Sequence, residues 1–265
     1  MELVDIGFNL TSSVFHKDAD EVVERAKQAG VKYFVLTGSD VEESARAAVL
    51  ATQYESMVST AGVHPHLAKQ WQEDSYTKLK KLAGHMKVTA IGEAGLDYNR
   101  NYSKPEQQRI AFKAQLELAT ELTMPIFLHE RDAHEDFVKI LSNHRQHLSK
   151  VVVHCFTGTA EELDTYIELD CHIGITGWIC DERRGQHLQT SIKNIPANRL
   201  MIETDAPYLL PRDLPKDKYP KPEGRRNEPA YLPHILSAIA KCRNTSEEQT
   251  AQETTQTAKD FFSIR

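Results

Sequence analysis

The chain has 265 residues, of which 40% are hydrophobic and 26% charged, and its formal net charge is −6. This composition supports a sizeable buried core and excludes a largely disordered chain, while the acidic balance excludes a uniformly basic coat protein for nucleic acids. No apolar run has the ~18 residues of a membrane span, and the start lacks a secretory signal, so we expect no membrane partner. The four scattered cysteines form no Cys-x-x-Cys pair, so we expect a reducing environment and a cytoplasmic protein. We also predict that the protein is a monomer.

Apolar runs rich in Val, Ile and Leu alternate along the chain with stretches of helical period, which is typical of βα units in a parallel sheet. The runs predicted as strands are Leu3–Leu10, Val31–Gly38, Met57–Val63, Val88–Leu96, Pro125–His129, Val151–Phe156, His172–Ile179 and Leu200–Thr204. Four of the predicted helices are Asp20–Ala29, Gln107–Leu122, Leu232–Lys241 and Glu247–Phe262. On the second of these, apolar residues recur every four positions at Ile110, Ala114, Leu118 and Leu122.

Eight such units of about 33 residues each predict an α/β fold, a (β/α)₈ TIM barrel, and a single domain over residues 1–265. The alternative is a doubly wound open sheet, which usually has a glycine-rich phosphate turn after an early strand. The first run instead ends in Gly7-Phe8-Asn9, which favours the barrel. The proline-rich stretch Tyr208–Pro229 predicts a long stiff loop before the last two helices.

Imidazole and carboxylate groups follow several of the predicted strands, where TIM barrels have their active sites. A histidine at a strand end is often a hydrogen-bonded capping residue, but a divalent metal explains a whole set of such residues at one mouth. The predicted metal ligands are Glu93, His129, His154 and Asp205. Oxygen and nitrogen ligands without a thiolate accept Mg²⁺, Mn²⁺ or Zn²⁺, and Glu93 could bridge two metals.

The turn after the third predicted strand reads His64-Pro65-His66. We expect His64, which is nearer the strand, to face the site, whereas His66 either contacts substrate or lies on the surface. Glu203 stands two residues before Asp205, so both carboxylates point to the same side of a regular strand.

Several arginines lie in the predicted loops at the same face of the barrel. Their guanidinium groups suit a phosphate or carboxylate substrate through bidentate contacts, although salt bridges to Asp181, Glu182 or Glu228 would also explain them. The predicted substrate-binding residues are Arg131, Arg183, Arg184, Arg225 and Arg226.

These residues lie in strings that resemble the TatD family of metal-dependent deoxyribonucleases. The strings are Ala61–His66, Ala90–Asp97, His129 with Arg131–Ala133, His154–Gly158 and Glu203–Leu209, and they span almost the whole chain. The further strings Asp181–Gly185 and Arg225–Ala230 resemble the bacterial members most. The resemblance implies a TIM barrel of the metal-dependent hydrolase type in which Glu93, His129, His154 and Asp205 bind the metal. It also implies a Mg²⁺-dependent 3′-to-5′ exonuclease on single-stranded DNA and RNA, linked to repair of oxidative DNA damage.

The chain departs from the family at the end of the first predicted strand. Most members have a His-x-His pair where this sequence reads Gly7-Phe8-Asn9. An amide oxygen is a weaker ligand than imidazole and glycine is none, so a second metal position is either empty or filled only when substrate phosphate adds oxygens. Such occupancy suits Mg²⁺, which retains waters and binds through substrate phosphates.

Our interpretation is a nuclease that hydrolyses phosphodiester bonds. Asp205 would hold or deprotonate the attacking water, His64 and Arg131 would contact the phosphate, and Glu203 would orient a metal ligand. One alternative is an amide or lactone hydrolase, a class that often uses the His-x-His pair and a carbamylated lysine on the fourth strand. The other is a degenerate, non-catalytic binding barrel, which the complete set of Glu, His and Asp residues disfavours.

Overall fold

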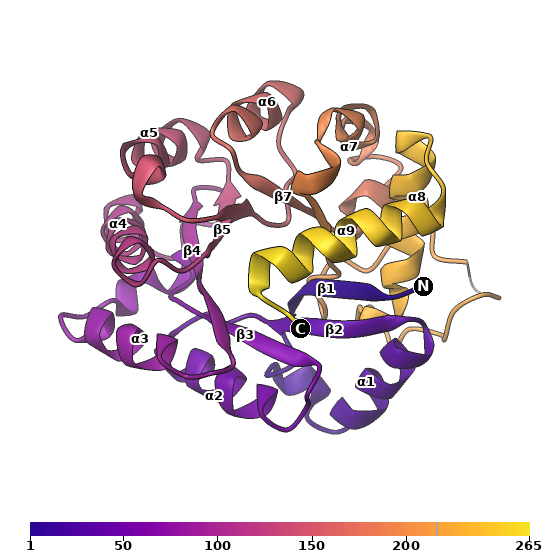
Figure 1. Ribbon diagram of the computed structural model, residues 1–265, viewed down its shortest axis with the longest axis horizontal. Coiled ribbons are helices and arrows are strands. Elements are labelled where there is room, and N and C mark those ends of the chain that lie inside the picture. Colours follow the sequence, from indigo (N-terminus) through magenta and orange to yellow (C-terminus); the bar gives the residue numbers. More distant parts are fainter. Residues whose placement is uncertain (216) are drawn as a thin grey trace.

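Eight parallel strands surround a common axis in the computed structural model, which describes residues 1–215 and 217–265 (Figure 1). The strands form one sheet in the order β1 to β8, and a parallel bridge between Phe8 and Ala206 connects the first strand to the segment after the last. The predicted TIM barrel is therefore confirmed. No helix in the described part of the chain is long and apolar enough to cross a membrane.

Each strand begins within one residue of its predicted start. The bounds are β1 Leu3–Phe8, β2 Val31–Leu36, β3 Met57–Ala61, β4 Val88–Asp97, β5 Ile126–Arg131, β6 Val151–Val153, β7 His172–Ile175 and β8 Leu200–Ile202. The predicted end of β7 at Ile179 is wrong, because Gly177–Cys180 forms a 3₁₀ helix, η4. The side chain of Thr176 caps this helix by accepting a hydrogen bond from the Trp178 N–H, which ends the extended backbone.

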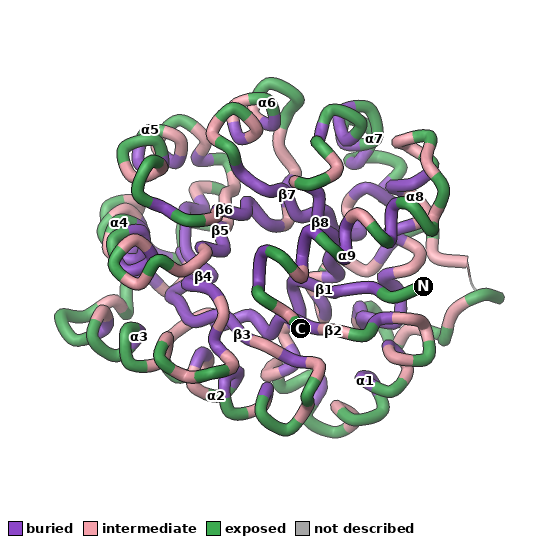
Figure 2. The backbone as a smooth tube through the Cα atoms, in the orientation of Figure 1, coloured by how far each residue is buried: buried purple, intermediate pink, exposed green. Residues whose placement is uncertain are grey.

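Helices surround the sheet on its outer side and expose one face to solvent (Figure 2). The bounds are α1 Ala19–Gln28, α2 Val41–Ala51, α3 Ser75–Ala83, α4 Pro105–Leu122, α5 His134–His144, α6 Ala160–Glu168, α7 Gln186–Ser191, α8 Leu232–Arg243 and α9 Glu247–Phe262. The predicted apolar stripe of α4 is wrong at Ile110, which is 55% exposed. A spacing of four drifts around a helix of 3.6 residues per turn, and the buried face instead runs through Gln108, Ala111, Gln115 and Leu118.

Helix α9 lies across one end of the barrel, on the side where the strands begin (Figure 1). Its residues Ala258, Phe261 and Phe262 pack in one hydrophobic cluster with side chains from β1 and β5, among them Val4 and Phe127. This packing closes the amino end of the barrel. The polar strand-end residues therefore lie at the opposite, carboxyl end, as in other barrels of this kind.

A buried carboxylate ties β1 to the segment that follows β8. Oδ1 of Asp5 accepts hydrogen bonds from the backbone N–H of Gly7 at 3.2 Å and of Thr204 at 2.9 Å, and Oδ2 accepts one from the Thr204 hydroxyl. Burial raises the pKa of Asp5 to about 7 against these hydrogen bonds. The contacts fix the backbone on both sides of Glu203, between the first and last strands.

The loop before α8 is fastened to α1 by charged groups. The guanidinium of Arg226 donates to Asp18 at 2.7 and 2.9 Å and to Glu228 at 2.7 Å, and Glu228 also accepts from Arg25 of α1. The Arg226 side chain is 9% exposed and that of Glu228 is 4% exposed. Arg225 by contrast is exposed.

We expect Arg226→Ala to lower the free energy of unfolding by about 2 kcal/mol, because it removes several charge-assisted hydrogen bonds and leaves Glu228 with Arg25 alone. Arg225→Ala is the matched control and should leave stability unchanged. Urea unfolding followed by circular dichroism measures both. Equal stability of the two variants would show that the Arg226 network contributes little to the fold.

Candidate active site

One carboxylate oxygen, Oε1 of Glu93, is the centre of the polar cluster at the carboxyl end of the barrel. Nε2 of His64, Nδ1 of His129 and Nε2 of His154 lie 3.1, 3.0 and 2.8 Å from this oxygen. Glu93 belongs to β4 and His129 to β5, while His64 and His154 follow β3 and β6. The structure thus brings together residues from four consecutive βα units.

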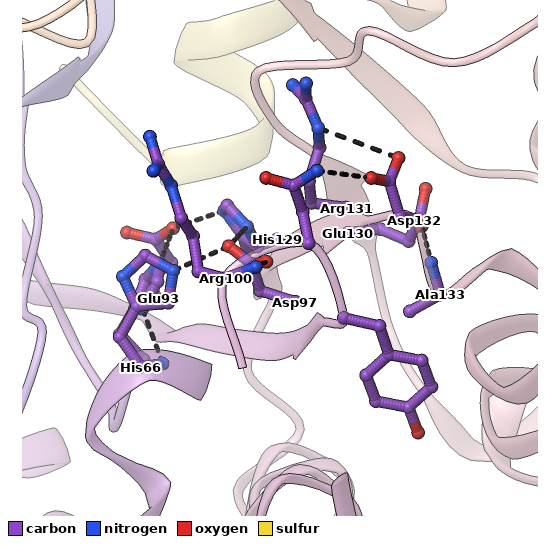
Figure 3. A network of polar contacts seen from close by, with 12 residues as sticks. His66, Glu93, Asp97, Arg100, His129, Glu130, Arg131, Asp132 and Ala133 are labelled. Atoms are coloured by element: carbon purple, nitrogen blue, oxygen red, sulfur yellow. Dashed lines mark hydrogen bonds and ion pairs between the residues drawn. The ribbon is translucent and has the colours of Figure 1, made fainter. Parts of the chain in front are cut away.

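Asp97, at the end of β4, is a second acidic residue of the cluster, and our sequence analysis did not single it out. Its Oδ2 lies 2.6 Å from Nε2 of His66 and 3.4 Å from Nε2 of His129, as Figure 3 shows. The longer contact lacks hydrogen-bond geometry, so Nε2 of His129 is a buried nitrogen without a hydrogen-bond partner in the described residues. Glu93 and Asp97 are four residues apart on one strand and so point to the same side, a signal that the sequence contained.

Glu203 is fully buried beneath the cluster, in space that two glycines leave free. A Cβ on Gly7 would lie 2.3 Å from Oε2 of Glu203, and one on Gly174 would lie 2.7 Å from Oε1. Oε2 also lies 3.1 Å from Nδ1 of His154, while Oε1 accepts the Cys155 N–H. Glu203 therefore occupies the space over Gly7 and orients the imidazole of His154, leaving its Nε2 directed at Glu93.

Asp205 lies two residues further along, with its backbone in the left-handed region at φ 54°. Its Oδ1 accepts a hydrogen bond from the Asn9 amide at 3.1 Å, so the position where the family has an imidazole provides an amide donor here. Burial raises the pKa of Asp205 to about 7, and the Glu93 and Glu203 carboxylates add to this against the opposing effect of His154.

The imidazoles divide into neutral and charged groups. Burial lowers the pKa of His64 to about 4, which keeps this ring neutral. Burial also lowers the pKa of His129, but the Asp97 and Glu93 carboxylates outweigh it and raise the value to about 9. The pKa of His154 is raised well above its usual value because Glu203 and Glu93 outweigh burial. In the metal-free protein, protons on two imidazoles thus balance the buried carboxylates.

A divalent cation fits the same place and would replace these protons. The ligand atoms of His64, Glu93 and His129 lie within 4.8 Å of one another, and His154 contacts the same Glu93 oxygen. Three imidazole nitrogens converge on one Glu93 oxygen, and a positive ion at this place would relieve the unfavourable charge on Asp205. All of these donors are nitrogen or oxygen, which suits Mg²⁺, Mn²⁺ and Zn²⁺.

The rim of the site carries an aromatic residue between two arginines. The guanidinium carbons of Arg131 and Arg184 lie 5.1 and 4.2 Å from the ring centre of Trp178, which sequence reasoning missed because its position in η4 depends on the early end of β7. Arg131 also donates to the Thr157 hydroxyl at 3.2 Å (Figure 3 shows its guanidinium directed away from the Glu93 cluster).

The remaining predicted arginines differ in their surroundings. Arg183 and Arg184 are more than half exposed, and both contact the buried Asp181 carboxylate, which Arg184 binds at 2.8 Å. Arg226 is engaged by Asp18 and Glu228, whereas Arg225 is open to solvent. A substrate contact for each of these four arginines stays a prediction.

Comparison with known proteins identifies the family. A family model described as TatD related DNase matches residues 4–263. The chain belongs to this family. It is 53% identical over 262 residues to the 3′-5′ ssDNA/RNA exonuclease TatD of Shigella flexneri and 52% identical over 262 residues to that of Escherichia coli K12, covering 99% of both chains in each comparison. A crystal structure of the E. coli K12 TatD homolog YjjV superposes with a TM-score of 0.90 at 25% identity, covering 99% of this chain and 98% of the other. The resemblance stated from the motifs is therefore confirmed, as is the expectation of a nuclease.

The space over Gly7 leads to a test of the site. We expect Gly7→Ala to destabilise the protein by about 1–3 kcal/mol, because the added methyl group overlaps the Glu203 carboxylate. The displaced carboxylate would also release His154, so the affinity for Mn²⁺ should fall. Gly84→Ala, at the end of α3, adds the same methyl group away from the site and is the control. Urea unfolding and metal titration measure the two effects, and unchanged metal affinity would remove Glu203 from the positioning of His154.

Proposed function

We propose that this protein is a metal-dependent 3′-to-5′ exonuclease that removes nucleotides from single-stranded DNA and RNA. The proposal rests on the convergence of three imidazoles on Glu93 at the mouth of the barrel. The S. flexneri and E. coli relatives, which match along 99% of the chain, are 3′-5′ ssDNA/RNA exonucleases, and this supports the same substrate class.

Glu93, His129, His154 and Asp205 would hold the cation, and the neutral His64 is a further donor within the same group. Mg²⁺ is the proposed ion, since the carboxylate-rich site leaves room for the phosphate oxygens and waters that Mg²⁺ retains; Mn²⁺ and Zn²⁺ are the alternatives. When bound, the cation polarises a phosphoryl oxygen and lowers the pKa of a bound water.

Asp205 is the residue for proton transfer. Its carboxylate faces Asn9 rather than an imidazole, so its second oxygen is free to accept the proton of an attacking water. With a cation beside it the carboxyl is ionised at neutral pH, because the positive charge offsets the effect of Glu93 and Glu203. Glu203 acts through His154, whose ring it orients.

The residues at the rim would bind the strand. His66 and Arg131 can donate to phosphate oxygens, and an unpaired base would replace one of the two arginines over the ring of Trp178. Stacking on an aromatic side chain requires a base that is not paired, which favours single strands over duplex. A role in repair of oxidative DNA damage is part of the proposal, because trimming of damaged 3′ ends is a task for such an activity.

The alternative of an amide or lactone hydrolase is less well supported. The fourth strand offers Glu93 where such enzymes often have a carbamylated lysine, and Glu203 fills the space in which a histidine at position 7 would lie. A degenerate, non-catalytic binding barrel would not need the carboxylates of Glu93 and Asp205 beside the imidazole of His154.

The function is tested with a 5′-labelled single-stranded oligonucleotide. We expect a ladder that shortens from the 3′ end with Mg²⁺ and stops with chelator, and a loss of turnover of about 10²-fold or more in Asp205→Asn, the low end of general-base catalysis. Asp74→Asn, at an exposed position beside α3, is the control. Hydrolysis of amide or lactone substrates without shortening of the oligonucleotide would favour the alternative. Turnover of Asp205→Asn within a few-fold of the parent, at saturating metal, would move the proton transfer to His64 or Glu203.

The arginines at the rim have their own test. Arg183→Ala combined with Arg184→Ala should weaken oligonucleotide binding more than metal binding, and each lost phosphate contact should reduce the slope of log affinity against log salt by about 0.7. Arg46→Ala, on α2, is an exposed control. An unchanged salt slope in the double variant would mean that both arginines serve Asp181 and the fold.

A further inference from the structure

A second group of metal-ligand side chains lies apart from the Glu93 cluster. Cys180 ends η4, Asp213 lies in the loop after β8, and His234 lies in the first turn of α8. The Cys180 sulfur, a carboxylate oxygen of Asp213 and a ring nitrogen of His234 all lie within 4.8 Å of one another. None of the three residues belongs to the catalytic cluster described above, and they come from three separate segments.

The three side chains differ in exposure in a way that suits entry of an ion. Cys180 is 3% exposed, and the side chain of His234 is 14% exposed, so both donors are fixed by packing. The Asp213 side chain is 54% exposed and closes the group from the solvent side. Its Oδ1 lies 2.7 Å from Nε2 of His234, and the ring of Tyr219 packs beside that imidazole at 5.8 Å.

We propose that Cys180, Asp213 and His234 bind a zinc-like divalent cation, with water as the fourth ligand. A thiolate, an imidazole and a carboxylate are the donors that Zn²⁺ accepts in tetrahedral sites, whereas Mg²⁺ prefers oxygen alone. Ligand atoms on a tetrahedral Zn²⁺ are about 3.3 Å apart for bonds near 2 Å, so the Asp213 carboxylate has to move by about half an ångström. Its exposed position allows this movement.

At Cys180, Asp213 and His234, a bond to the ion would replace a hydrogen bond that is present in the metal-free protein. Burial and the Asp213 carboxylate raise the pKa of the Cys180 thiol, so the metal-free protein keeps the proton on sulfur. On binding, that proton leaves to solvent, the sulfur coordinates as thiolate, and Nε2 of His234 gives up its contact with Asp213 for the ion. The same raised pKa makes Cys180 a poor nucleophile, which disfavours a covalent role.

Ion binding would also connect three segments of the fold, which are η4, the proline-rich loop and α8. Asp213 is the one ligand from the proline-rich loop, and η4 and α8 already pack against each other. An ion at this place would attach the loop to that pair of elements. Because one of its donors is a thiolate, this site would disfavour Mg²⁺ more strongly than the nitrogen and oxygen donors of the catalytic cluster do.

The test uses the sulfur ligand. Metal-free full-length protein is titrated with Co²⁺, and we expect a near-ultraviolet thiolate-to-cobalt charge-transfer band that saturates and is displaced by Zn²⁺. Cys180→Ser should abolish the band, and Asp213→Asn and His234→Gln should each weaken Co²⁺ binding at least tenfold. Asp213→Asn changes an exposed side chain, so its fold is not at risk. Circular dichroism establishes that Cys180→Ser is folded.

Two further cysteines serve as controls. Cys155 lies beside Glu203 and Asp205, so a band that is lost in Cys155→Ser and kept in Cys180→Ser would place the ion at the catalytic cluster and overturn the proposal. Cys242→Ser, on α8, should keep the band. Absence of a band in the parent protein would also overturn the proposal and leave an ordinary hydrogen-bonded cluster.

Discussion

The site depends on one electrostatic constraint, which is that several buried or half-buried carboxylates from β4 and from the segment after β8 lie close together at one mouth of the barrel. Glu93, Asp97, Glu203 and Asp205 cannot all be ionised away from water without positive partners. The chain meets this requirement with His129 and His154, whose pKa values the carboxylates raise. A divalent cation meets it better, since it carries two charges in the position of the protons. The arrangement that makes the carboxylates costly in the free protein thus makes the site selective for cations.

The barrel makes this concentration of charge possible. Among the proposed ligands, Glu93 and His129 lie in the second halves of β4 and β5, while His154 and Asp205 follow β6 and β8. Adjacent parallel strands bring these positions to one mouth of the barrel. Small residues then allow the side chains to approach. A Cβ on Gly95 would lie 1.9 Å from the His129 carbonyl oxygen, and the backbone of this glycine has φ 140°, so β4 and β5 can meet so closely between Glu93 and Asp97 only without a side chain there.

Much of this could be predicted from the sequence, because parallel strands and their ends leave simple signals. The apolar runs fixed the start of each strand within a residue, and the polar residues after them fell at one end of the barrel. The place of Asp97 in the site could have been predicted in the same way, because it lies four residues after Glu93 on one strand and points to the same side. The position of Trp178 could not have been predicted in this way, because the Thr176 side chain caps η4 and Trp178 lies in that helix instead of in β7. The burial of Arg226 depends on its contact with Asp18, far away in the sequence, which local periodicity does not contain. The exposure of Ile110 follows from the local drift of a four-residue spacing around a helix.

Gly7 and Asn9 stand where most family members have a pair of histidines, and the surrounding side chains use these two positions differently. Where a histidine at position 7 would offer a ligand nitrogen, Glu203 occupies the space and binds Nδ1 of His154 instead. Where a histidine at position 9 would offer another, the Asn9 amide donates to Asp205. At both positions the observed contacts are hydrogen bonds that orient His154 and Asp205. An imidazole that donates one N–H to a carboxylate has a more basic second nitrogen, and the direction of its ring is fixed. Position 7 therefore contributes space and position 9 a hydrogen bond to the site, where most family members have two imidazoles.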